Sequence, residues 1–120
     1  MKRIFFTMIF CLLFAASSHA ALKVIGSGDK LQLDASRFPP AMKSAYQLMQ
    51  KKCTSCHTLE RVVIALQTGI TPTTLLEFNK KTAKDHCDKM IRKPNANISQ
   101  QDAKTVTELL YYLIDESAKK

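Results

Sequence analysis

The sequence predicts a small all-α domain of four to five short helices. Several segments place apolar residues three and four positions apart, the spacing that gathers them on one face of an α-helix. Residues typical of helix starts and stops bound these segments, and the sequence contains no repeats or low-complexity tracts. The chain has the length of one domain, small enough that a metal, disulfide or cofactor would help to fill its core.

Residues 1–20 have the pattern of a secretory signal peptide. Lys2 and Arg3 precede an apolar run over residues 4–16, and Ser18-His19-Ala20 offers small residues at the positions that determine cleavage. The run is shorter than the roughly 20 residues that span a bilayer. An uncleaved membrane anchor is the alternative. We expect export, cleavage at the end of this segment and a periplasmic product.

The expected mature chain is basic and soluble. Without the two cations of the leader, sixteen basic and ten acidic residues remain, which lowers the net charge from +8 to +6. The mature sequence contains no second apolar segment of membrane-spanning length. Its cysteines number three, and an odd count leaves one thiol unexplained if exported cysteines pair as disulfides.

The first elements of the mature chain lead towards a cysteine pair. Residues 21–38 predict either a short hairpin, with its turn at residues 26–29, or an extended arm, and Pro39-Pro40 ends this segment. The next segment, residues 41–52, predicts a helix that runs directly into Cys53. Its apolar positions follow the helical spacing i, i+3, i+4, i+7: Met42, Ala45, Tyr46 and Met49.

The following segments predict a second helix and a short turn. Residues 59–67 have helical character, and Gly69 is the expected end of that helix. Thr71-Pro72 then has the pattern of an N-cap with proline at the first helical position, which predicts a short helical turn through Phe78.

Two further helices complete the expected fold. Thr82 is the expected cap of a helix that ends before Pro94, with Ala83, Cys87, Met90 and Ile91 on one face. Ser99-Gln100-Gln101-Asp102 resembles a capping box and opens the clearest helix of the chain. Its apolar stripe comprises Ala103, Val106, Leu109, Leu110, Leu113 and Ile114.

The motif Cys53-Thr54-Ser55-Cys56-His57 has the Cys-x-x-Cys-His pattern of c-type haem attachment. Two thiols at this separation can each add to one haem vinyl group, and the adjacent histidine can then bind the iron as the proximal ligand. A zinc site would need His86 and Cys87, whose adjacency is awkward for two ligands. A thioredoxin-like disulfide would need a preceding strand, and a structural disulfide would not need the histidine.

The second iron ligand has two principal candidates. Met42 and Met49 lie at helical spacing and are expected in the core. Met90 lies downstream of His57, near the end of a predicted helix, and His86 lies one helical turn before it. His/Met ligation gives a higher reduction potential than His/His ligation, and an open position would permit peroxide or gas chemistry.

The span from Phe38 to Leu113 resembles the class I monohaem c-type cytochromes. The resemblance lies in a helix that leads into Cys-x-x-Cys-His, a methionine downstream and a last helix. It implies a cytochrome c-like domain over residues 39–120, with the helices packed around one covalently attached haem c. It also implies roles for four residues: Cys53 and Cys56 form the thioethers, His57 is the proximal ligand and Met90 the distal ligand.

These features predict an electron-transfer protein rather than an enzyme. No general acid, base or nucleophile stands out, and a small haem peroxidase or ligand sensor is the alternative function. We expect a monomer that meets redox proteins with acidic docking surfaces and does not bind nucleic acid. The expected basic rim comprises Lys51, Lys52, Lys80, Lys81, Lys84, Lys89, Arg92 and Lys93, which are otherwise ordinary solvated helix residues.

Overall fold

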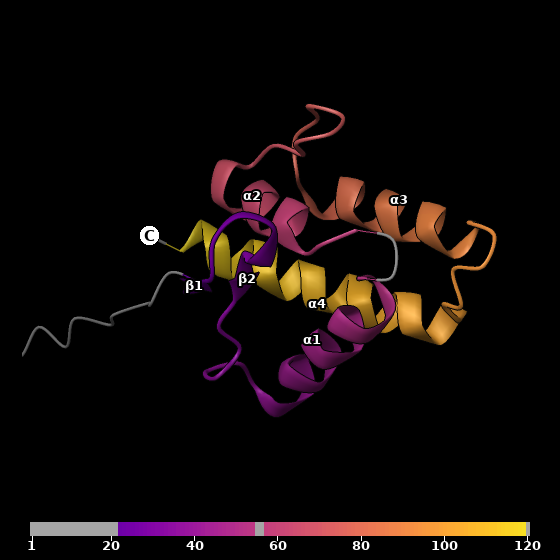
Figure 1. Cartoon of the computed structure of the whole chain (residues 1–120), viewed down its shortest axis with the longest axis horizontal. Helices are drawn as coiled ribbons and strands as arrows, with labels where there is room; N and C mark the ends of the chain where they lie inside the picture. Colours follow the sequence, from indigo (N-terminus) through magenta and orange to yellow (C-terminus); the bar gives the residue numbers. More distant parts are fainter. Residues whose placement is uncertain (1–21, 55–56, 120) are drawn as a thin grey trace, which may run out of the picture.

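The computed structural model describes residues 22–54 and 57–119 (Figure 1). The predicted signal peptide and Cys56 lie outside these residues. The described chain is mainly helical, which confirms the prediction of a small helical fold, with one two-stranded sheet added to it. Its elements, in chain order, are β1 (Val24–Ile25), a 3-10 turn (Gly28–Lys30), β2 (Gln32–Leu33), α1 (Pro40–Lys52), α2 (Glu60–Thr68), α3 (Lys80–Ile91) and α4 (Gln100–Ala118).

The segment before the helices forms the hairpin, the first of its two predicted alternatives. β1 pairs antiparallel with β2, and Val24 lies opposite Leu33. The turn requires glycine at position 26, where φ is 80° and an added Cβ would lie 2.3 Å from the carbonyl oxygen of Lys30. The backbone N–H of Leu33 donates a 2.9 Å hydrogen bond to the buried Tyr46 hydroxyl. This bond fixes the hairpin to α1.

Helix α4 is the element on which the other helices pack. Its N-terminus has the predicted capping box, in which Ser99 and Asp102 each accept a backbone N–H of the other. Leu109 and Leu113 are 0% exposed at its centre. α4 contacts α1, α2 and α3, and in Figure 1 it runs between α1 and α3. The apolar stripe predicted from the sequence is therefore the spine of the core.

Helix α1 forms where predicted and delivers the cysteine motif. Ala45, Tyr46 and Met49 are buried, and Met42 packs partly buried against the same core. The helix ends at Cys53, whose backbone N–H donates a 2.9 Å hydrogen bond to the carbonyl of Met49. The two predicted core methionines thus lie on the side of α1 that faces the core.

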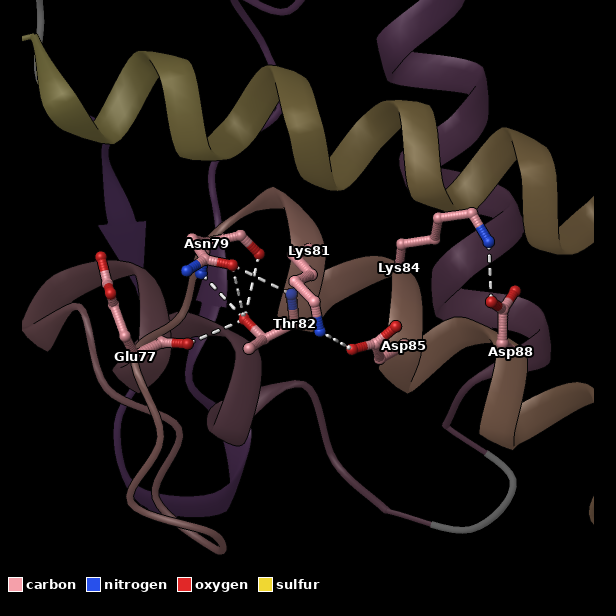
Figure 2. Close-up of polar contacts among 7 residues, drawn as sticks. All are labelled: Glu77, Asn79, Lys81, Thr82, Lys84, Asp85 and Asp88. Atoms are coloured by element: carbon pink, nitrogen blue, oxygen red, sulfur yellow. Dashed lines mark hydrogen bonds and ion pairs between the residues drawn. The ribbon is translucent and has the colours of Figure 1, made fainter.

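Helix α3 begins earlier than predicted. Its N-cap is Asn79, not Thr82, and Thr82 is the third helical residue of a capping box. The Asn79 side chain accepts the backbone N–H of Thr82, and the Thr82 hydroxyl accepts the backbone N–H of Asn79 (Figure 2). Both residue types cap helices well, so the local sequence did not decide between them.

The loop between α2 and α3 contains one turn after Thr71-Pro72, in which the backbone N–H of Leu75 donates a 2.9 Å hydrogen bond to the carbonyl of Thr71, but this turn does not continue through Phe78 as predicted. α2 ends as expected at Gly69, which has φ 75°, but the chain then forms an isolated antiparallel bridge between Ile70 and Glu77. The backbone N–H of Thr71 donates a 2.8 Å hydrogen bond to the carbonyl of Leu76. Pairing across the loop therefore limits the helical hydrogen-bond pattern to this one turn. At its tip Leu75 is 77% exposed and has φ 56°.

Leu75→Gly is expected to stabilise the protein. A leucine in the left-handed region carries steric strain that glycine lacks, and an exposed side chain contributes little buried area, so the free energy of unfolding should rise by about 1 kcal/mol. Thermal or denaturant unfolding measures the change. Thr73→Gly in the same loop, where φ is not positive, is the matched control and should lower stability by about 0.5 to 1 kcal/mol. A lower free energy of unfolding in Leu75→Gly would contradict the steric strain inferred at Leu75.

Candidate haem-binding site

His57 follows the end of α1 and is oriented by its own backbone neighbour. Its Nδ1 lies 2.9 Å from the carbonyl oxygen of Thr58. A carbonyl only accepts hydrogen bonds, so Nδ1 carries a proton, and in the neutral ring the lone pair is then on Nε2. Metal-binding histidines commonly have this arrangement, in which a carbonyl fixes the tautomer and ring orientation. His57 therefore meets the requirement for an iron ligand that binds through Nε2.

His57 lines a cleft of about 550 Å³. This volume lies within the roughly 300–1,000 Å³ that is usual for cofactor sites. The walls come from the end of α1, from α2, from the loop after α2, from α3 and from the segment before α4. Their lining residues include Cys53, His57, Arg61, Val62, Thr71, Pro72, Thr73, Thr74, Leu76, Phe78, His86, Lys89, Met90, Lys93, Ile98 and Leu110.

The inner end of the cleft is apolar. It continues as a cavity of about 40 Å³ against the core, where Met49, Val106 and Leu110 meet Cys53 and Cys87. Lys52 covers this end from α1 by donating a 3.0 Å hydrogen bond to the carbonyl of Asn97. A group that is apolar on one edge and reaches the cysteine motif would find matching walls here. The residues present therefore fit a haem.

The two predicted candidates for the second ligand both line this cleft. His86 and Met90 lie four residues apart on α3, and both also line its apolar inner end. The ring centres of His57 and His86 are 6.3 Å apart, with an angle of 61° between the ring planes. The structure thus brings His57 together with the α3 face that carries both candidates. Sequence spacing alone predicted this face but gave no distance.

The ring of His86 favours its neutral form. The walls of the cleft partly desolvate it, and the positive charges of Lys89, Arg61 and, when it is protonated, His57 oppose a further one, so its pKa is lowered from the ordinary value. A part of the residue remains exposed at the mouth of the cleft. A neutral imidazole has the lone pair that metal binding requires.

The two described cysteines are both free thiols next to this cleft. Cys53 is half-buried, and burial raises the pKa of its thiol to about 11, with smaller contributions from Cys87 and Asp102. Cys87 is 6% exposed, and burial raises the pKa of its thiol as well. Cys87 occupies a core position as a small apolar side chain. Cys56, the other half of the motif, lies outside the described residues.

The surroundings of Cys53 also bear on the other chemistries considered for the motif. A helix, α1, precedes Cys53, whereas a thioredoxin-like site would follow a strand. Within residues 22–54 and 57–119, no three or more His, Cys, Asp or Glu side chains gather in a way that could hold a metal ion. In the same residues, no helix is long and apolar enough to cross a membrane.

The charge around the cleft differs from the predicted rim. On α3, Lys81 pairs with Asp85 at 3.0 Å and Lys84 with Asp88 at 2.7 Å (Figure 2), and Lys80 reaches Asp115 on α4 at 3.0 Å. These three lysines are therefore paired. Three other cations, Arg61, Lys89 and Lys93, line the cleft and form no ion pair with any described residue.

Arg61 and the loop over residues 71–74 were missed by the sequence analysis. Arg61 lies four residues after His57, in the first turn of α2, which brings it to the cleft. The short separation between Arg61 and His57 along the chain was the only sequence feature that could have indicated this position. The threonine-rich loop carries no chemical motif, and only the packing shows that it forms a wall.

Comparisons with models of known families, with curated proteins and with solved structures found no match to the chain.

The Cys87 thiol is expected to be unreactive in the folded protein. Burial excludes reagents and raises its pKa, so less thiolate is present at pH 8. Alkylation should be at least about tenfold slower than in the unfolded chain, because a thiol that is only 6% exposed is shielded from the reagent. Mass spectrometry after iodoacetamide treatment, with and without denaturant, measures the rates. Equal rates in both conditions would contradict the burial of Cys87.

Proposed function

We propose that this chain is a cytochrome c-like electron-transfer protein that carries one covalently attached haem c. The observation that carries the proposal is His57 beside Cys53 at a cleft of about 550 Å³, with Nε2 free and His86 and Met90 on a facing helix. Cys53 and Cys56 would form the thioethers, His57 would be the proximal ligand and Met90 the distal ligand. Residues 39–120 would form the haem domain of an exported, periplasmic and soluble monomer.

The bound haem would supply an iron that alternates between ferrous and ferric states. The chain's own residues would hold it and set its surroundings. Val62, Phe78 and Leu110 would exclude water from the apolar part of the cleft. The Thr58 carbonyl would keep the His57 ring in its ligating tautomer. A low local dielectric and a thioether ligand both favour the ferrous state and a higher potential.

Two candidate ligands on one face of α3 support electron transfer over the alternative function. A peroxidase or a gas sensor needs an open or easily opened coordination position. Met90 and His86 both line the cleft that His57 enters, so a six-coordinate iron is favoured. No residue of the cleft is required as a general acid or base for electron transfer.

Covalent haem is the decisive test of this function. The full chain, expressed with a c-type haem maturation system, should keep its haem after denaturation and extraction with acidified acetone, because thioethers survive both. Cys53→Ala with Cys56→Ala should lose covalent haem, and Cys87→Ala is the matched control that should keep it. A colourless wild-type product with reactive thiols at Cys53 and Cys56 would contradict the proposal.

The unpaired cations at the cleft support a redox partner with an acidic docking surface. Arg61, Lys89 and Lys93 would also lie near the haem carboxylates, which offset part of their charge. The remaining positive field at the exposed edge would attract an acidic protein and speed its approach. The partner would thus meet the protein at the mouth of the cleft, where the distance between the haem and the partner's redox centre is shortest.

Lys89→Gln with Lys93→Gln should slow oxidation of the ferrous protein by an anionic reagent such as hexacyanoferrate. At low ionic strength we expect a roughly two- to fivefold loss of rate, which shrinks above about 0.15 M salt because the charges are screened. Stopped-flow absorbance measures the rate. Lys30→Gln with Lys43→Gln removes the same charge from exposed positions away from the cleft and should have a smaller effect. Equal losses in both variants would contradict a local rim.

A further inference from the structure

The separation of the two histidine rings has a specific meaning in metal chemistry. Metal–imidazole bonds are about 2 Å long, and a ring centre lies about 1.2 Å behind its ligating nitrogen, so two imidazoles on opposite sides of one ion have centres about 6.3 Å apart. The ring centres of His57 and His86 are 6.3 Å apart. His86 therefore already lies at the separation from His57 that shared ligation requires.

The surroundings of His86 leave it free for this role. Its ring forms no hydrogen bond with any of the described residues, and the only ring it contacts there is that of His57. Met90 lies one turn further along the same uninterrupted helix, and side chains four residues apart are neighbours on a helix surface. Both residues therefore line the same cleft from one helix.

We infer that His86 is a reserve ligand, which binds the haem iron opposite His57 when the Met90 thioether is absent or detached. The inference rests on the proposed haem. Both side chains belong to α3 and line the same cleft, so the proposed exchange does not bring in a ligand from another element. His/His ligation gives a lower potential than His/Met ligation, so the exchange would convert the protein into a poorer electron acceptor without exposing the iron.

Variants of the haem-loaded full chain test this inference by spectroscopy. Met90→Ala should lose any thioether-to-iron charge-transfer band and yet remain low-spin in its absorption and electron paramagnetic resonance spectra. Met90→Ala with His86→Ala should become high-spin and bind cyanide at least tenfold faster. Free imidazole should return this double variant to the low-spin state. Met90→Ala with Lys84→Ala, which changes an exposed residue of the same helix, should remain low-spin.

The outcomes separate the inference from the function on which it rests. A high-spin Met90→Ala protein with covalent haem overturns the inference alone, and so does a double variant that stays low-spin through some other ligand. A wild-type protein without the thioether band, made high-spin by His86→Ala alone, overturns the reserve role, because His86 is then the permanent ligand and Met90 is removed from the proposed site. A chain that never acquires haem overturns both proposals.

Discussion

The packing of α4 against the other helices is the constraint on which the candidate site depends. Leu109 and Leu113 are fully buried at the centre of α4, with α1 and α3 on either side of it. The end of α1 carries Cys53 and leads to His57, and the last turns of α3 carry His86 and Met90. The two walls of the cleft are therefore spaced by one shared helix. A substitution that leaves a cavity in the middle of α4 would change the distance between the two walls of the cleft as well as the stability of the protein.

The helices could be predicted because their signals are local. Apolar spacing marks α1 and α4, and the Ser99 and Asp102 side chains cap α4 within one turn of chain. The errors arose where several local patterns compete. Asn79 and Thr82 are both good caps, and both take part in one capping box. Thr71-Pro72 has the composition of a helix start and opens one turn, but hydrogen bonds between Thr71 and Leu76 then close the loop, so the turn does not extend to Phe78.

The site could be predicted in part for the same reason. The cysteine motif brings its reactive groups together within five residues, so Cys53 and His57 are identifiable without knowledge of packing. The distance from His57 to His86 depends on how α3 lies on α4, which spacing along the chain does not determine. Arg61 belongs to the cleft only because the first turn of α2 faces it. Residues whose role comes from tertiary placement carry no local signal.

The shape and lining of the cleft are the reasons for proposing a large amphipathic cofactor rather than a bare metal ion. A structural zinc site is closed by four ligands, whereas this cleft has room for many non-hydrogen atoms. Its inner end is apolar, and unpaired cations line other parts of it. The proposed haem has an apolar edge and carboxylates, and the cleft is lined by apolar side chains and by cations.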